Sequence, residues 1–390
     1  MPKIRIFSKD FFLMLLFSIV LLSNWYDGNM VRMLLFAIVV LFTIPILKYS
    51  DKYFVVLLLF ILSFSFTLFL NGYTSSFVYV AYISLPPLAF YLYGSYIGNR
   101  CQSSRSIEFV LLLFYSLYVI VVISLAIIDY IDTGALVSTS RAIYTDDAQS
   151  VVLVGDRSIL SIGVIGVPLF FITKGKERFI YMIIGVLSIF SSFHYLHRTP
   201  IVVLIICSII LFLNQFKKVN FITLIIFVCA VYLLAMSNHM TDSDLILGYS
   251  SRNAYDANSF GDRLPRWLDA IGKIIKYPFG WSQNTDTYNK YVHNLWLDTA
   301  RIAGLFPFIF YTVFTLMSFA FTIKRWCLKD SVSATFLLLD FSFLLSCFVE
   351  PIFESYPTHA WMFIFYTGMK VQYYSRKTLI VPNEKQKSIK

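Results

Sequence analysis

The chain has 390 residues, of which 58% are hydrophobic and 14% charged, and its formal net charge is +10. Soluble domains average about 45–50% apolar and about 25% charged residues, so this composition excludes a soluble enzyme, a disordered chain and a disulfide scaffold. Phe, Tyr and Trp make up 18% of the chain, which suits a protein with aromatic belts at the membrane interfaces. The composition therefore predicts an all-α polytopic membrane protein.

Apolar segments long enough to cross a bilayer recur along the whole chain. A hydrocarbon core about 30 Å thick needs roughly 20 apolar residues in a helix. We expect one membrane domain over residues 1–390 with about twelve transmembrane helices. The first segment lacks a small-x-small cleavage site, so we interpret it as an anchor and not as a signal peptide. The expected spans are residues 10–24, 31–47, 53–70, 77–97, 107–128, 158–173, 179–196, 199–213, 219–236, 302–323, 332–349 and 360–374.

Basic residues alternate between the connections of these spans. One side of the membrane would hold 21 of the 32 Lys and Arg residues, while the other would hold 11 basic and 15 acidic residues. By the positive-inside rule the basic side is cytoplasmic, which places both termini in the cytoplasm. The positive charge is explained by this orientation, so we expect membrane lipid as a partner and no nucleic acid.

Two connections are long, and both fall on the outer side. They are the first outer loop, residues 129–157, and the large outer loop, residues 237–301, between spans 9 and 10. Long loops commonly carry function. Apolar residues at helical spacing over 263–277, with basic residues between them, predict an amphipathic helix on the membrane surface. A second helix is expected to begin near His293 and to run toward the next span.

The histidines are all expected outside the membrane or at its outer edge. Histidine is the side chain best suited to proton transfer near neutral pH. The alternative is that these side chains lie there only because polar residues avoid the spans. His194 and His197 are three residues apart and could share a metal ion, but no third ligand is spaced nearby, so we expect no metal. The five histidines are His194, His197, His239, His293 and His359.

The segment that begins at His293 combines four polar residue types. On a helix, one face of this segment would carry a base, an amide, an acid and a cation. The segment would lie where the chain enters the membrane, which suits a substrate with one polar and one apolar end. The alternative is an ordinary polar stripe at a membrane interface. The four residues are His293, Asn294, Asp298 and Arg301.

Arginines at the starts of helices are the candidate anion-binding residues. Arg198 is followed by Thr-Pro, which suits the first turn of a helix whose free N–H groups attract phosphate. The alternative for each arginine is contact with lipid headgroups. Asp340 lies in the middle of a span, where an acid is costly in lipid, so we expect it to face the bundle interior. The candidates for binding phosphate or pyrophosphate are Arg157, Arg198, Arg263 and Arg266.

Three segments resemble motifs of the O-antigen ligase and polymerase superfamily. A His-Arg-Thr triplet stands where the family has Ser-Arg-Gly or Ser-Arg-Thr at the start of a span. An Arg-x3-Trp…Pro-x-Gly block and a His-Asn-x-x-Leu…Gly pattern follow in the family's order. The resemblance covers about residues 190–325, and the first half of the chain matches only in topology. The residues that carry it are His197, Arg198, Thr199, Arg263, Trp267, Pro278, Gly280, His293, Asn294, Leu297 and Gly304.

The resemblance implies a metal-independent glycosyltransferase without a cofactor, acting on the outer face of the bacterial plasma membrane. Its donor and acceptor would be glycans linked to undecaprenyl pyrophosphate, and a chain-length regulator and a flippase of the same pathway are candidate partners. By this resemblance His293 acts on the acceptor hydroxyl, while Arg198 and Arg263 hold the pyrophosphate. Arg266 and Arg157 would assist in binding, and Asn294, Asp298 and Arg301 would support the site.

Three other functions stay open at this point. An O-antigen ligase would share the motifs and transfer the glycan to lipid A–core. A flippase or other transporter usually shows repeats, broken spans and ionisable residues at the midplane, whereas only Asp340 is clearly mid-span here and no repeat is visible. A scaffold that regulates chain length would not need the His-Arg constellation. We therefore favour glycosyl transfer, and a polymerase over a ligase because polymerase chains diverge widely.

Overall fold

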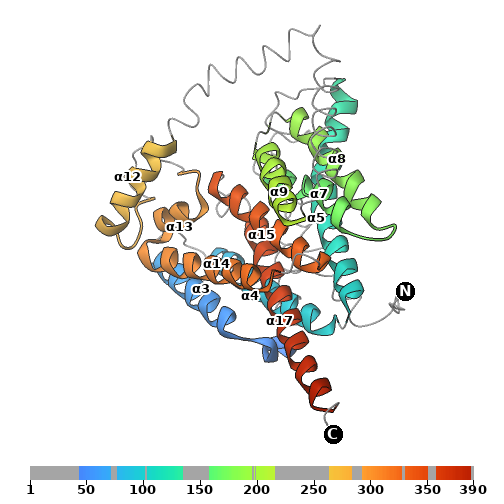
Figure 1. The fold of residues 1–390 in the computed structure, drawn as a ribbon. Helices are drawn as coiled ribbons and strands as arrows, with labels where there is room; N and C mark the ends of the chain where they lie inside the picture. The colour runs from blue at the N-terminus through green and yellow to red at the C-terminus, as the bar shows by residue number, and fades with distance from the viewer. Residues whose placement is uncertain are drawn as a thin grey trace. The chain divides into compact units, whose positions relative to one another are not determined.

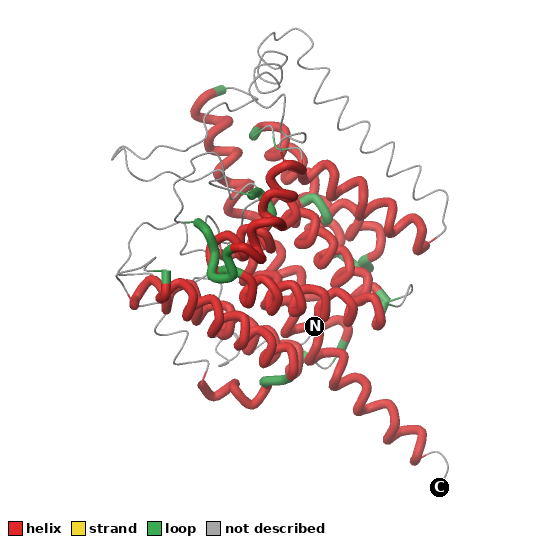
Figure 2. The backbone as a smooth tube through the Cα atoms, turned by 90° about the vertical axis from the view of Figure 1, so that its left-hand side faces the viewer, coloured by secondary structure: helices red, strands yellow, loops and turns green. Residues whose placement is uncertain are grey.

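The computed structural model describes residues 44–71, 77–101, 103–134, 158–195, 197, 199–215, 263–282, 292–326, 330–349 and 357–387. These residues are almost entirely helical (Figure 1), and no strand occurs among them (Figure 2). The predicted all-α fold class is confirmed for this part of the chain. The helices are η1 (Ile44–Tyr49, a 3-10 helix), α3 (Lys52–Leu70), α4 (Phe77–Arg100), α5 (Ser104–Thr133), α6 (Ser158–Gly163), α7 (Gly166–Ile172), α8 (Arg178–His194), α9 (Thr199–Gln215), α12 (Arg263–Lys276), α13 (Leu295–Ala303), α14 (Leu305–Arg325), α15 (Ser331–Val349) and α17 (Pro357–Lys387).

Four of the described helices are long and apolar enough to cross a membrane. Helices α6 to α9 supply shorter apolar segments. The expected total of about twelve spans stays a prediction, because the spans at 10–24 and 219–236 lie outside the described residues. Of the span at 31–47 only the last four residues are described, and they belong to η1. The four long segments are Lys52–Leu70, Ser104–Asp132, Leu305–Arg325 and Ser331–Phe348.

The expected span at 158–173 is not one continuous helix. It is divided into α6 and α7 by a turn at Val164 and Ile165. Pro168 has no N–H to donate to the carbonyl of Val164, so the ladder of hydrogen bonds is interrupted there. The carbonyl of Ser161 accepts a hydrogen bond from the Ser342 hydroxyl at 2.6 Å, which stabilises the broken segment against α15.

The last helix differs from its expected span in length. Helix α17 continues to Lys387, well beyond the expected end at residue 374. Lys370 lies within the expected span and is buried in this helix, with its ammonium 5.9 Å from the centroid of the Phe363 ring. A cation over an aromatic face is one way to hold a buried lysine.

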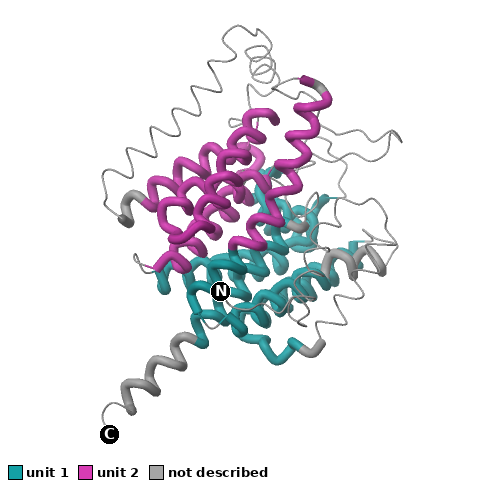
Figure 3. Tube along the Cα trace, turned by 90° about the vertical axis from the view of Figure 1, so that its right-hand side faces the viewer, with its two compact units in different colours: residues 1–111, 269–326, 351–390 teal, residues 112–268, 327–350 magenta. Residues whose placement is uncertain are grey.

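The chain divides into two compact units (Figure 3). Unit 1 comprises Met1–Leu111, Asp269–Trp326 and Pro351–Lys390, and unit 2 comprises Leu112–Leu268 and Cys327–Glu350. In unit 1, α4 packs along α17 and α3 packs along α14, and the short α13 lies against both α3 and α14. In unit 2, α6 and α7 pack against α8 and α9, and α15 packs against α9.

Close helix contact in unit 1 depends on glycine. A Cβ atom at Gly94 or Gly98 of α4 would lie 2.0 or 2.1 Å from a carbonyl oxygen of α17. Two glycines four residues apart let helix backbones approach each other closely, which is a common basis for helix pairing in membranes. This pair therefore owes its tight packing to the absence of side chains at these positions.

Candidate functional site

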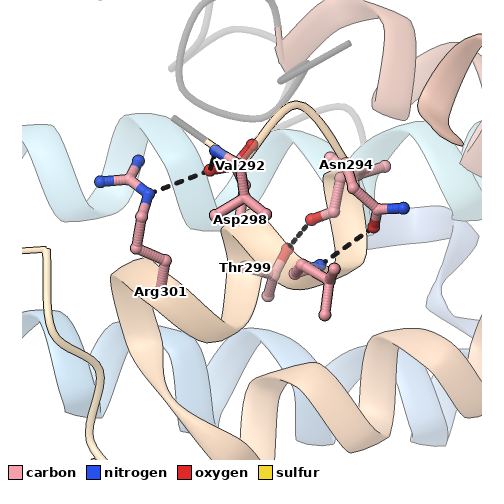
Figure 4. A network of polar contacts seen from close by, with 7 residues as sticks. Val292, Asn294, Asp298, Thr299 and Arg301 are labelled. Carbon is pink, nitrogen blue, oxygen red and sulfur yellow. Dashed lines mark hydrogen bonds and ion pairs between the residues drawn. The ribbon is translucent and has the colours of Figure 1, made fainter. Parts of the chain in front are cut away.

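Helix α13 begins with a side-chain cap. Asn294 has an extended backbone, with φ −154° and ψ 119°, and its Oδ1 accepts a hydrogen bond from the Leu297 N–H at 3.2 Å (Figure 4). Asparagine is among the preferred residues at this position because its oxygen satisfies a free N–H of the first turn. The cap therefore starts the helix at Leu295 and leaves His293 outside it.

His293 has a left-handed backbone conformation, with φ 55°. Among the described residues it is the one non-glycine residue with positive φ. This conformation costs roughly 1–2 kcal/mol for a residue with a Cβ atom, and such strain collects at functional sites. Its side chain is half-buried. The structure thus holds an imidazole in a backbone geometry that the sequence alone would not favour.

A buried carboxylate holds the segment that contains His293. The Oδ1 atom of Asp298 accepts hydrogen bonds from the Val292 N–H at 3.0 Å and from Nε of Arg301 at 2.9 Å (Figure 4). Asp298 is 1% exposed and Arg301 is 3% exposed. The two opposite charges therefore pair inside the protein, and the carboxylate also ties down the residue that precedes His293.

The expected four-residue helical face is wrong in part. Asp298 and Arg301 do share a face of α13 and bind each other. His293 and Asn294 instead form the loop and the cap before the helix. The physical reason is that the asparagine side chain accepts a hydrogen bond from a backbone N–H of the first turn. The helix therefore begins after Asn294 and does not extend back to His293.

The turn after α12 is attached to the end of α13. The N–H groups of Trp281 and Ser282 both donate to the Arg301 carbonyl, at 2.8 and 3.0 Å, and the Leu305 N–H donates to the Pro278 carbonyl at 2.9 Å. Gly304 has φ +83°, and a Cβ atom there would lie 2.0 Å from the Pro278 oxygen. The Pro-x-Gly block and the His-Asn…Gly pattern, which are separate in sequence, therefore meet through their backbones.

Helix α3 also contributes to this turn. The amide Nδ2 of Asn71, at the C-terminal cap of α3, donates to the Phe279 carbonyl at 2.6 Å. Within α13 and α14, the indole N–H of Trp296 donates to the Thr315 hydroxyl at 3.0 Å. Apolar helices of unit 1 thus fix both the turn and α13.

Helix α12 covers the expected amphipathic segment and places its two arginines on different stripes of its surface. At helical spacing Arg263 shares a stripe with Ala270 and Ile274, both buried. Arg266 shares the neighbouring polar stripe with Asp269 and Lys273, which form an ion pair at 2.8 Å. A third stripe is apolar and exposed; it consists of Leu264, Leu268, Ile271 and Ile275.

The other predicted site residues fall into two groups. Arg157, Arg198 and His239 lie outside the described residues. Arg263 and Arg266 belong to unit 2, while the His293 segment belongs to unit 1.

The structure pairs His194 with Asp129, an acid that the sequence analysis did not single out. Nε2 of His194 lies 2.8 Å from Oδ2 of Asp129, and both residues are buried in unit 2. The sequence signal was the position of Asp129 in the last turn of a long apolar segment, where an acid needs a partner. The described part of the chain contains no cluster of three His, Cys, Asp or Glu residues that could hold a metal ion. His359 is buried at the start of α17, and Asp340 is buried in α15.

A scan against protein-family models finds no match to this chain, and a search of curated proteins finds none either. What the site can do therefore rests on its own chemistry. It presents a half-buried imidazole on a strained loop, held by a neutralised acid and base and framed by apolar helices. A group of this kind can remove a proton from a hydroxyl.

Proposed function

We propose that the chain is a membrane glycosyltransferase that polymerises oligosaccharide repeat units linked to undecaprenyl pyrophosphate. The product would be O-antigen, capsule or exopolysaccharide. The observation that carries the proposal is the left-handed His293, directly before α13. The Pro-x-Gly turn is attached to the other end of this nine-residue helix, so two sequence patterns that resemble the same family are joined through α13.

The proposed topology has about twelve spans, cytoplasmic termini and an active site on the outer face. Helix α14 supports it, because it starts directly after Gly304 and ends with Lys324 and Arg325. Its 21 residues, at about 1.5 Å each, extend roughly 30 Å, which is about the thickness of the hydrocarbon core. The basic end suits the cytoplasm, so the His293 end suits the outer face.

The proposed reaction is a displacement at an anomeric carbon. His293 takes the proton of the acceptor hydroxyl, and the acceptor oxygen forms a bond to the anomeric carbon of the donor. The bond between that carbon and the pyrophosphate oxygen breaks, and undecaprenyl pyrophosphate departs with the electron pair. Arg263 and Arg198 stabilise the charge that develops on this leaving group, with Arg266 and Arg157 as weaker contributors.

The test is a reconstituted assay with the purified chain and a lipid-linked repeat unit, with products separated on a gel. His293→Gly keeps the backbone conformation and removes the base, so we expect a loss of rate on the order of 10²–10⁴. Added imidazole should restore part of that rate. His239→Gly is the matched control and should stay active. Full activity of His293→Gly would refute the assignment.

The products also separate the polymerase from the ligase. A ladder of lengthening products supports a polymerase, whereas transfer only to added lipid A–core supports a ligase. The interruption between α6 and α7 and the buried Asp340 favour a second candidate, a transporter of lipid-linked sugars, because broken helices and intramembrane acids are common in transporters. Movement of the lipid-linked unit across vesicles without any new glycosidic bond would favour that candidate.

A further inference from the structure

Asp298 is a buried acid that the proposed reaction does not use. It is 1% exposed, and its Oδ2 atom makes no hydrogen bond within the described part of the chain. Its Oδ1 atom accepts from a backbone N–H and from Arg301. Burying an acid in this way is costly unless it is paired and hydrogen-bonded, so the arrangement calls for a physical reason.

The contacts of Oδ1 point toward the backbone. The Val292 N–H lies one residue before His293, the residue with φ 55°. Asp298 sits on the first turn of α13, and its own N–H donates to the Asn294 carbonyl at 2.7 Å. Hydrogen bonds of Asp298 therefore lie on both sides of the left-handed His293, and the bond from Val292 is the one that depends on the carboxylate. Without the carboxylate the Val292 N–H loses its acceptor, and the loop is free to relax to an unstrained conformation.

Arg301 connects the ion pair to the turn that follows α12. Its Nε neutralises the carboxylate, and its carbonyl accepts from Trp281 and Ser282. A carboxylate that is neutralised in this way and turned toward a backbone N–H is poorly suited to exchanging protons with the substrate.

We propose that Asp298 is a positioning residue for His293, with Arg301 as its charge partner. The carboxylate fixes the backbone of Val292, the residue before His293, and so keeps the imidazole in the orientation that proton removal needs. This inference rests on the proposed role of His293 as the base. It assigns no proton transfer to Asp298.

The kinetic test compares two variants in the assay described above. Asp298→Asn keeps an oxygen that can accept from Val292 and Arg301. Asp298→Ala with Arg301→Met removes the acceptor without leaving an unpaired charge. We expect the double variant to lose on the order of 10²-fold in kcat with KM nearly unchanged, because misplacing a catalytic group by about 1 Å costs that much. The Asn variant should keep most of kcat, and the pH profile should keep its acid-side fall.

Two kinetic outcomes would overturn the proposal. Wild-type kcat in the double variant would show that no positioning is needed. Equal losses in both variants, with a changed pH profile, would show that Asp298 moves a proton. Only protein that elutes as a single species on size exclusion would be compared.

A stability measurement tests the same inference independently of the reaction. His293→Gly relieves backbone strain only while the loop is held, so it should raise Tm in the wild-type and Asp298→Asn backgrounds. In the double variant the gain in Tm should disappear. An equal gain in all three backgrounds would overturn the inference. If His293→Gly proves fully active, the proposed function fails, yet the Tm comparison still decides whether Asp298 holds the loop.

Discussion

The left-handed backbone of His293 is strained, whereas a glycine would adopt the same conformation without strain. Replacing it with glycine removes a Cβ atom from a left-handed position, so we expect His293→Gly to stabilise the protein by about 1 kcal/mol. The measurement is thermal unfolding of the purified protein in detergent. His293→Ala keeps the Cβ atom and serves as the control, with no such gain. A variant that is more stable and inactive would show that the chain accepts strain for the sake of this imidazole.

Asn294 has a structural role that can be separated from chemistry. Asn294→Ala removes the cap of α13 and should cost about 1 kcal/mol of stability, while Asn294→Asp and Asn294→Ser keep an acceptor and should restore it. Activity should fall only mildly in the Ala variant, because His293 remains. The same thermal unfolding and gel assays report both effects. A complete loss of activity in a well-folded Ala variant would instead indicate contact with the substrate.

At this scale the sequence predicted that Asp298 and Arg301 share a helical face, but it predicted neither their ion pair nor the geometry of His293. A spacing of three residues places an acid and a base on one helical face whatever surrounds them. The left-handed backbone at His293 is held by the hydrogen bond from the Val292 N–H to the side chain of Asp298, six residues later, and by the helix cap at Asn294. Residue type and spacing carry no direct signal for such a contact.

Among the elements, α12 gives the sharpest distinction between two predicted residues. Arg263 lies on the stripe with the buried Ala270, whereas Arg266 lies on the stripe with the partly exposed Asp269–Lys273 pair. We therefore expect Arg263→Ala to lower kcat/KM at least 10-fold more than Arg266→Ala. Arg263→Lys should restore little, because a lysine cannot bind pyrophosphate with two parallel hydrogen bonds. Equal, small effects of both Ala variants would assign the two arginines to lipid headgroups.

Substitution by alanine at two helical glycines should change the stability of the protein in opposite directions. Gly98→Ala would place a Cβ atom 2.1 Å from the Met369 oxygen and should lower Tm by separating α4 from α17. Gly272→Ala in α12 meets nothing within 4 Å and should stabilise by about 0.5–1 kcal/mol through helix propensity. Thermal unfolding of both variants checks the pair. An unchanged Tm for Gly98→Ala would mean that close packing of α4 and α17 contributes little to stability.

Helix positions followed from hydropathy wherever a helix was long and uninterrupted, as in α3 and α14. The break between α6 and α7 did not, because Pro168 is tolerated within membrane helices when another group satisfies the freed carbonyls, and that depends on tertiary packing.

For the whole molecule, the orientation in the membrane is the property most open to direct measurement. Single cysteines at Ser103, Asn258 and Ser388, in a Cys-free background, would be labelled with an impermeant maleimide in intact cells. Asn258→Cys should react, while Ser103→Cys and Ser388→Cys should react only after permeabilisation. Labelling of Ser103→Cys in intact cells would contradict the positive-inside orientation.

The native Cys101, kept as the single cysteine of a parallel variant, should be a poor probe. Burial raises the pKa of its thiol from 9.0 to about 11, so the thiolate fraction near neutral pH falls about 100-fold. We expect slow labelling of Cys101 in permeabilised cells, with the rate rising as the pH is raised toward that pKa. The neighbouring Ser103→Cys, on an exposed turn, is the fast control. Equal rates at the two positions would show that Cys101 is accessible.

The division into two units was not predicted from the sequence. Each unit is assembled from segments far apart along the chain, for example Asp269–Trp326 with Met1–Leu111 in unit 1. Hydropathy reports which segments enter the membrane, but it does not report which of them pack together. That choice depends on shape, such as the close contact at Gly94 and Gly98.

The anchoring of Ser282 and Val292 to the same short helix has a consequence for changes in loop length. Ser282 bonds to the carbonyl of Arg301 and Val292 bonds to the side chain of Asp298, one turn away. Insertions between these two anchors begin and end at fixed points, and each doubling of a loop's length costs only about 0.6 kcal/mol. A change in the length of the chain between these anchors should therefore leave the imidazole of His293 in place, because neither anchoring hydrogen bond depends on that length.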